Sequence, residues 1–334
     1  MLKNARFLLS SSKISHKELS GIILMIINCA TLAMIDVMAK VLRADMSSGM
    51  IVFCYKFTLF ILILPWVMRH GFKYLKTKRI HVHILRSLTG TIGALFFFQG
   101  LKYISVADAS ALENVQYLVI FCLSFILFKE KITKTKVTAI TIGLVGALIV
   151  VHPDLFSIGV QRNIKPISNY VFTLIAISMW ALNSVIIKLL GNTENNKTQM
   201  FYVLLFASII SFPTAFFKWE GIDIFSYSIP LAPKLLNFSA LNLSWWHFAL
   251  LFSMALVYFV HASAYFHSLR SELSVVVPYR YTKLAFSALL GYIFFKETIA
   301  LNSLIGYALI IVSGLMLLRY QIRKSRKNPK DRVQ

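Results

Sequence analysis

The sequence predicts an all-α integral membrane protein with ten transmembrane helices, arranged as two inverted five-helix repeats with both termini in the cytoplasm. The first observation behind this is composition: the 334 residues are 57% apolar and only 14% charged, whereas soluble domains have about 25% charged residues. Mean hydropathy is +0.70. This composition excludes a cytosolic enzyme, a disordered protein and a disulfide-built secreted module. Its net charge is nevertheless +22. What this charge indicates about function depends on where in the chain the charged residues lie.

The second observation is a series of ten apolar segments. Each is about 20 residues long, the length that a helix needs to cross a hydrocarbon core of roughly 30 Å. The runs are continuously apolar rather than alternating, which excludes a transmembrane β-barrel. In chain order, we expect membrane spans at about 20–42, 47–69, 81–103, 104–128, 133–152, 169–190, 199–218, 244–268, 271–295 and 300–320.

The basic residues predict the orientation of these spans. With the N-terminus inside, the inner segments hold 22 of the 35 Lys and Arg residues and the outer segments hold 7. Cytoplasmic loops are enriched in Lys and Arg, so both ends are expected in the cytoplasm, with the basic tail anchored beside anionic lipid. The expected organisation is a basic N-terminus at 1–19, a first repeat at 20–153, a connecting loop at 154–168, a second repeat at 169–320 and a tail at 321–334.

The third observation is an internal repeat. At an offset of 167 residues, Phe128-Lys129-Glu130-x-Ile132 falls on Phe295-Lys296-Glu297-x-Ile299, and each copy closes an apolar run. Because each half holds five spans, an odd number, the second half crosses the membrane in the opposite sense. Inverted repeats are typical of secondary transporters.

These motifs also resemble a known family. The segment from Ser105 to Leu112, with the Phe-Lys-Glu that closes its span, resembles the EamA repeat of the drug/metabolite transporter superfamily. A second copy runs from Leu273 through Pro278 to the second Phe-Lys-Glu. The resemblance covers 20–320 and implies a ten-helix carrier for small metabolites. One departure is Tyr117, which stands where many members have Pro. Within the superfamily, the segments Asp36-Val37-Met38-Ala39-Lys40 and His83-Ile84-Leu85-Arg86 are similar to S-adenosylmethionine uptake carriers.

Four charged residues, Lys56, Glu113, Arg280 and Lys283, lie about ten to thirteen residues into their spans. A charge at mid-bilayer costs about 2.5–3.5 kcal/mol on insertion scales, so these side chains must face one another or a hydrated cavity. The repeat relates Glu113 to Arg280 and Gln116 to Lys283. Two interpretations stay open: a structural ion pair between the halves, or a substrate site whose ions exchange partners.

The surplus of buried cations favours a substrate with a carboxylate or phosphate. Arg280 is the better bidentate partner, and Lys56 and Lys283 act as point charges. Asp36 adds a second acid, for which Lys40, one turn later, is a candidate partner.

Aromatic and amide side chains complete the expected substrate site. Tyr117, Trp180 and Tyr279 could stack on a nucleobase or hold an onium group by cation–π attraction, although such aromatic residues more often serve in packing. Gln116 lies beside the central charges as a further candidate substrate-binding residue. The candidates for coupling or gating are Asp36, Lys40 and His261, with snorkelling and a helix-to-helix hydrogen bond as the alternatives for Lys40 and His261. We expect neither a metal site nor a cofactor, since Cys29, Cys54 and Cys122 lie in apolar runs without ligand spacing.

The chain has no phosphate-binding loop and no H-E-x-x-H motif, so we expect a secondary transporter rather than an enzyme. The expectation is a carrier of the inner membrane that moves a small polar metabolite by alternating access, with S-adenosylmethionine or a related amino-acid-like or nucleoside-like solute as the first candidate. The alternatives are a metabolite exporter of the same superfamily and a membrane enzyme or assembly subunit acting on lipid. The expected partners are the substrate and the bilayer, not nucleic acid; monomer and homodimer are both open.

Overall fold

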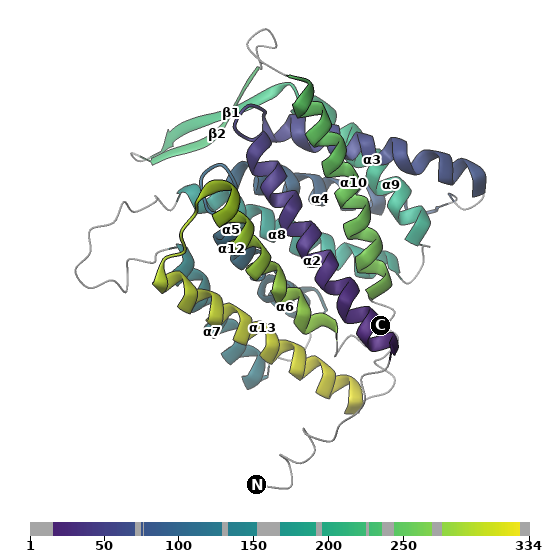
Figure 1. Cartoon of the computed structure of the whole chain (residues 1–334). Helices are drawn as coiled ribbons and strands as arrows, with labels where there is room; N and C mark the ends of the chain where they lie inside the picture. Colours follow the sequence, from purple (N-terminus) through teal and green to yellow (C-terminus); the bar gives the residue numbers. More distant parts are fainter. Residues whose placement is uncertain are drawn as a thin grey trace, which may run out of the picture.

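A computed structural model describes most of the chain, as a bundle of long helices (Figure 1). The described residues are 16–70, 75, 77–128, 133–151, 168–191, 196–224, 227–235, 244–268 and 276–327. The N-terminal segment through residue 15, nearly all of the expected connecting loop and the last seven residues of the tail lie outside them, as does Lys129 to Ile132 of the first Phe-Lys-Glu motif.

Seven helices in the described part of the chain are long and apolar enough to cross a membrane. They are α2 (His16–Leu42), α3 (Ser48–His70), α4 (Ile80–Gly100), α7 (Lys134–Val151), α8 (Ser168–Gly191), α10 (Trp245–Ser268) and α13 (Leu301–Lys327). Each corresponds to a predicted span, and α13 continues seven residues beyond the predicted end. An eighth helix, α9 (Asn196–Thr214), contains a shorter apolar stretch, Thr198–Thr214.

Two segments that the sequence predicts as continuous spans are interrupted. The first divides into α5 (Val106–Glu113) and α6 (Gln116–Phe128). The second begins in a 3₁₀ helix, η4 (Val277–Tyr281), and continues as α12 (Thr282–Phe295). Pro278 lies in the first turn of η4 and has no N–H to donate, which accounts for an irregular start. The break before α6 occurs without a proline: it lies at residues 114–115, just before Tyr117, the position at which many members of the resembled family have Pro.

A two-stranded antiparallel hairpin is the other difference from the all-α prediction. Strand β1 (Phe217–Ile224) pairs with β2 (Tyr227–Leu235), with Phe217 opposite Leu235. The hairpin lies at one end of the helices (Figure 1), in the stretch that the sequence predicts as a join. Its aromatic and β-branched residues favour strands, a signal too short to register among long apolar runs.

Helices from before residue 152 pack against helices from after residue 168. α2 packs against α10 and α12, and α8 packs against α4 and α6. α3 packs on α9, α7 on α13, and α5 against α12. α3 also packs on α10, and α9 on α4. Figure 1 shows α2 between α10 and α12, with α7 and α13 side by side at one edge.

The surface of the bundle is apolar along the helices. Leu301 is 76% exposed and Ile126 is 66% exposed, and large apolar side chains are exposed on nearly every long helix. Large exposed apolar patches on a protein mark membrane or protein interaction sites. With the apolar helices, these surfaces support a multi-pass membrane protein.

Candidate functional site: a charged pocket where two interrupted helices meet

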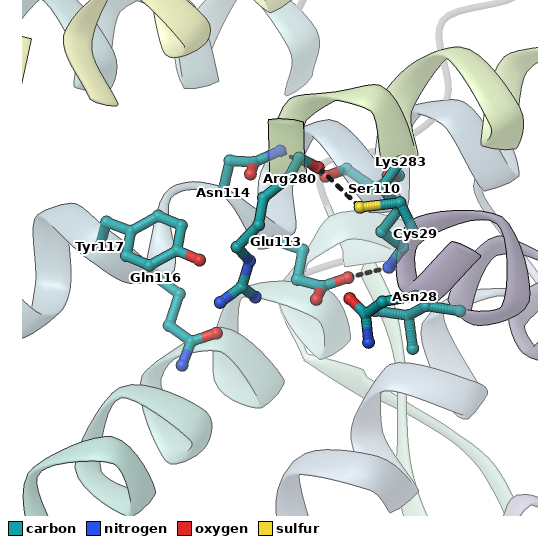
Figure 2. Close-up of a pocket in the computed structure, with 10 residues that line it drawn as sticks. Asn28, Cys29, Ser110, Glu113, Asn114, Gln116, Tyr117, Arg280 and Lys283 are labelled. Carbon is teal, nitrogen blue, oxygen red and sulfur yellow. Dashed lines mark hydrogen bonds and ion pairs between the residues drawn. The ribbon is translucent and has the colours of Figure 1, made fainter. Parts of the chain in front are cut away.

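A pocket lies where the two interrupted segments meet α2 (Figure 2). It contains about 340 Å³ of space, counting the open solvent at its mouth. Its lining is polar, and consists of Asn28, Cys29, Leu32, Ser110, Glu113, Asn114, Gln116, Tyr117, Arg280 and Lys283. Glu113 ends α5, Gln116 begins α6, and Arg280 precedes the start of α12, so the interruptions bring backbone ends and charges to one place.

Lys283 joins three segments through two carboxylates. Its ammonium lies 2.9 Å from Asp36 Oδ2 of α2 and also forms an ion pair with Glu113 Oε2 of α5. These side chains are 7%, 3% and 15% exposed, respectively. Since two acids share one base, this cluster has a formal charge of −1 when all three groups are ionised, which favours a cationic group of a ligand nearby.

Arg280 has a different environment. Its guanidinium lies over the rings of Tyr117 and Tyr265, 5.4 and 5.5 Å from their centroids. Among the described residues, no carboxylate lies within ion-pair distance of it. In Figure 2 its side chain extends into the pocket toward Tyr117 and Gln116. Arg280 is therefore the cation of the pocket that can receive a carboxylate from a ligand.

The α2 wall of the pocket is held by contacts to α10 and η4. Asn28 Nδ2 donates to the carbonyl of His261 at 3.0 Å and lies 2.8 Å from His261 Nδ1. Cys29 Sγ donates to the carbonyl of Arg280 at 3.4 Å. The structure thus places His261 in a helix-to-helix hydrogen bond, one of the two interpretations of this residue.

Gln116 and Trp180 connect the pocket to α8. Gln116 Nε2 donates to the carbonyl of Trp180 at 3.0 Å and to Ser184 Oγ at 2.9 Å. The Trp180 ring packs against Phe97, with centroids 4.9 Å apart, and does not line the pocket. Tyr279 does not line it either, and packs against an apolar cluster that includes Met25 and Cys29.

Lys56 lies outside the pocket, beside two tyrosine rings. It is 8% exposed, and its ammonium lies 5.0 Å from the ring centroid of Tyr55 and 5.2 Å from that of Tyr258. Although it was grouped with Glu113, Arg280 and Lys283 because of its depth, Lys56 is not part of the pocket lining.

Lys40 and Glu297 form a separate ion pair at the far ends of α2 and α12. Lys40 Nζ lies 2.5 Å from Glu297 Oε1 and 2.5 Å from the carbonyl of Ile104, and Glu297 Oε2 accepts the N–H of Val106 at 2.9 Å. Lys296 ends α12 in a left-handed conformation, φ 55°, which turns Glu297 back toward α5. In the described part of the chain, the expected pair of Asp36 with Lys40 is replaced by these pairs between helices, and Lys40 is not directed outward as a snorkelling residue.

Some residues of the site were not anticipated from the sequence: the lining residues Asn28, Cys29, Leu32 and Ser110, and Tyr265, which contacts Arg280. Asn28 is an amide in the middle of an apolar run, a signal that could have identified it. Tyr265 lies one turn after His261 on α10, so it could have been found from helical spacing. Cys29, Leu32 and Ser110 had no such signal.

Comparison with known proteins identifies the first part of the chain. Residues 19–152 match the EamA-like transporter family. This segment is an EamA-family domain. The domain contributes Asp36, Glu113 and Tyr117 to the site, whereas Arg280 and Lys283 lie beyond the matched residues.

Proteins that are similar over most of this chain are named as transporters. A protein of Rickettsia bellii (strain RML369-C), named S-adenosylmethionine uptake transporter, is 28% identical over 290 residues, which are 87% of this chain and 90% of that protein. The protein of the same name in Rickettsia prowazekii (strain Madrid E) is 25% identical over 92% of this chain and 95% of its own length. A pseudopaline exporter of Pseudomonas aeruginosa (strain UCBPP-PA14) is 23% identical over 90% of this chain and 96% of its own length.

A crystal structure of a protein 16% identical in sequence has the same fold. It matches with a TM-score of 0.53 and covers 92% of this chain and 98% of that chain. The family domain and the named relatives support a small-molecule membrane transporter.

Proposed function

We propose that this chain is a secondary transporter that moves a small polar metabolite by alternating access, and that S-adenosylmethionine is the first candidate. The observation that carries the proposal is the separation of charge in the pocket. Arg280 has no described carboxylate partner, whereas Lys283 is shared by the two acids Asp36 and Glu113. A ligand with a carboxylate and a cationic group complements this arrangement, since the carboxylate can pair with Arg280 and the cation with the two acids.

The roles of the site residues follow from their chemistry. Arg280 binds the carboxylate, since a guanidinium can hold it in a bidentate manner. Glu113, the most exposed member of the acid cluster, receives the amine. Tyr117 and Tyr265, whose ring faces attract cations, contribute to holding a sulfonium or to stacking on an adenine. Gln116 positions α6 against α8 through its two hydrogen bonds.

Alternating access is supported by the matching packing pairs of the two halves. If each predicted span of the first half is equivalent to the span five places later, then α2 is equivalent to α8 and α4 to α10. The packing of α2 on α10 then has its equivalent in that of α8 on α4, and the packing of α2 on α12 in that of α8 on α6. We propose on this basis two inverted repeats, 20–153 and 169–320, with ten membrane crossings and both termini in the cytoplasm. Discontinuous helices at a central site are a recurrent feature of such carriers. The proposed location is the inner membrane.

The test is uptake of labelled S-adenosylmethionine into cells or proteoliposomes, with unlabelled amino acids, nucleosides and S-adenosylmethionine as competitors. We expect saturable uptake that unlabelled S-adenosylmethionine inhibits best, and loss of uptake in Arg280→Ala and Glu113→Gln. Normal transport by these variants in well-folded protein contradicts the assignment of the site.

The same assay separates the alternatives. Efflux from preloaded vesicles without uptake favours an exporter, the activity named for the Pseudomonas aeruginosa relative. Recovery of a chemically altered compound, or modification of the vesicle lipids, favours a membrane enzyme.

A further inference from the structure

The three segments that are joined beside the pocket are joined a second time at their other ends. Beside the pocket, the base at the start of α12 holds carboxylates of α2 and α5. At the far end, Lys40 of α2 pairs with Glu297, which follows α12 and accepts the N–H of Val106, the first residue of α5. Lys40 also donates to the carbonyl of Ile104, just before α5. We call Lys40, Glu297, Ile104 and Val106 the latch.

The latch closes this end of the three segments. Ile104 and Val106 are fully buried. The start of α5 lies close to α12 here, since a Cβ at Gly291 would be 2.7 Å from Glu297 Oε2 and 3.8 Å from Val106 Cβ. A solute can therefore reach the pocket from this face only when α2, α5 and α12 separate. With the N-terminus in the cytoplasm, as proposed, this is the outer face.

The backbone at the end of α12 is adapted to the latch. Lys296 has φ 55° and is the one non-glycine residue with positive φ in the described part of the chain. Such conformations are uncommon for residues other than glycine, and they cluster at functional and switch regions. Lys296 turns Glu297 back toward α5, and the missing side chain of Gly291 leaves room for the Glu297 carboxylate. Two separate backbone features therefore serve this one contact.

The latch is also suited to opening and closing. The side chains of Lys40 and Glu297 are each 16% exposed, and both regain water when the segments part. Since desolvation offsets much of the attraction within a shielded ion pair, separating the two ions into water costs far less than deleting one of them. α5 connects the latch to the pocket, because Val106 is its first residue and Glu113 its last, about 10 Å apart along the helix. A ligand that moves Glu113 therefore also acts on the latch.

We propose that the latch is the gate of the pocket at this membrane face. It is closed in the structure, and it opens in the step of the transport cycle that connects the pocket to this face. Lys40 and Glu297 thus control access to the pocket and do not recognise the solute. This deepens the proposed function, and rests on it for the solute and the cycle but not for the access that the latch controls.

The test measures access to the pocket from the latch side, with the full chain in sealed vesicles. Cys29, Cys54 and Cys122 are replaced by alanine. Leu32→Cys, at a partly exposed position of the pocket lining, is then the reporter for a membrane-impermeant cationic methanethiosulfonate. Lys102→Cys, at an exposed position between α4 and α5, identifies the side of the vesicle on which the latch lies. From that side we expect Leu32→Cys to be labelled at least tenfold more slowly than Lys102→Cys.

Opening the latch is expected to expose the reporter. Glu297→Gln should raise the labelling rate of Leu32→Cys about tenfold, in line with the loss of one charge-assisted contact. Because this change removes a negative charge, it does not attract the cationic reagent, and the increase reports access. Gly291→Ala keeps every charge, displaces the Glu297 carboxylate and should also raise the rate. Its matched control is Gly90→Ala on α4, where a Cβ would likewise lie 2.7 Å from a side-chain end, the amide nitrogen of Asn183, and where we expect no change.

All rates are compared below the unfolding midpoint of each variant. Unchanged labelling in Glu297→Gln or in Gly291→Ala, or an equal increase in Gly291→Ala and Gly90→Ala, would overturn the gate. Labelling of Leu32→Cys as fast as that of Lys102→Cys with the latch intact would overturn it as well. If both latch variants raise the rate but the wild type takes up no S-adenosylmethionine, the proposed substrate is wrong and the gate stands. If uptake is saturable but labelling does not respond to the latch variants, the gate alone is wrong.

Discussion

Replacing Lys283 has an effect on thermal stability that can be estimated from the structure. Its ammonium is the base shared by Asp36 and Glu113, and all three side chains are largely shielded from water. Lys283→Met keeps the length of the stem and removes the charge, which leaves two carboxylates close together without their base.

The magnitude follows from the burial of the cluster. Breaking a buried ion pair by removing one partner costs about 3–5 kcal/mol. At roughly 2–3 °C per kcal/mol for a chain of this size, the midpoint of thermal unfolding is expected to fall by about 6–15 °C. The triple variant Lys283→Met, Asp36→Asn, Glu113→Gln should recover much of this loss, because no unpaired charge is then left behind and neutral replacement of buried ions is often tolerated.

The assay is thermal unfolding of the purified full chain in nanodiscs, followed by tryptophan fluorescence. Lys102→Met serves as the control for loss of an exposed lysine, and should change stability by no more than about 0.5 kcal/mol. A midpoint for Lys283→Met within 2 °C (about 1 kcal/mol) of the wild type, or a triple variant less stable than the single one, would refute the reasoning.

Two further predictions concern contacts away from the pocket. Glu297→Gln is expected to lower the unfolding midpoint by several degrees, since the largely buried Lys40 loses a carboxylate 2.5 Å away; a double-mutant cycle with Lys40→Met tests this, and fully additive effects would show that the pair is not coupled. Gly146→Val is expected to cost about 1–3 kcal/mol by overpacking, because a Cβ at Gly146 would lie 2.8 Å from the carbonyl oxygen of Gly306 on the neighbouring helix. Leu144→Val on the exposed face of α7 is its control, and equal midpoints for the two variants would contradict the close contact.

The sequence was sufficient to predict the long apolar helices and to select three of the charged residues that line the pocket. Glu113, Arg280 and Lys283 could be selected because hydropathy places them far from the ends of their spans, and the structure brings all three to one pocket. The breaks in the two segments that hold them were not predicted. A 19-residue average of hydropathy is insensitive to a two-residue interruption, and the first interruption occurs without proline or glycine.

The partners of the charges could not be predicted, for a geometrical reason. The depth of a residue along the membrane normal can be estimated from one sequence, but the direction in which its side chain points depends on how the helix packs against its neighbours. Asp36 was therefore assigned to Lys40 of its own helix, whereas it pairs with Lys283 across the bundle. Lys56 has a depth similar to that of the pocket residues and yet faces Tyr55 and Tyr258.

The central claim is that Arg280 recognises the carboxylate of a transported solute. The most direct measurement compares the initial rates of uptake of S-adenosylmethionine and of its decarboxylated analogue into proteoliposomes, for the wild type and for Arg280→Gln. We predict that the wild type prefers the carboxylate-bearing compound by about tenfold or more in kcat/KM, the worth of one charge-assisted contact, and that Arg280→Gln does not discriminate. The same preference in both proteins, with uptake intact, would contradict the claim.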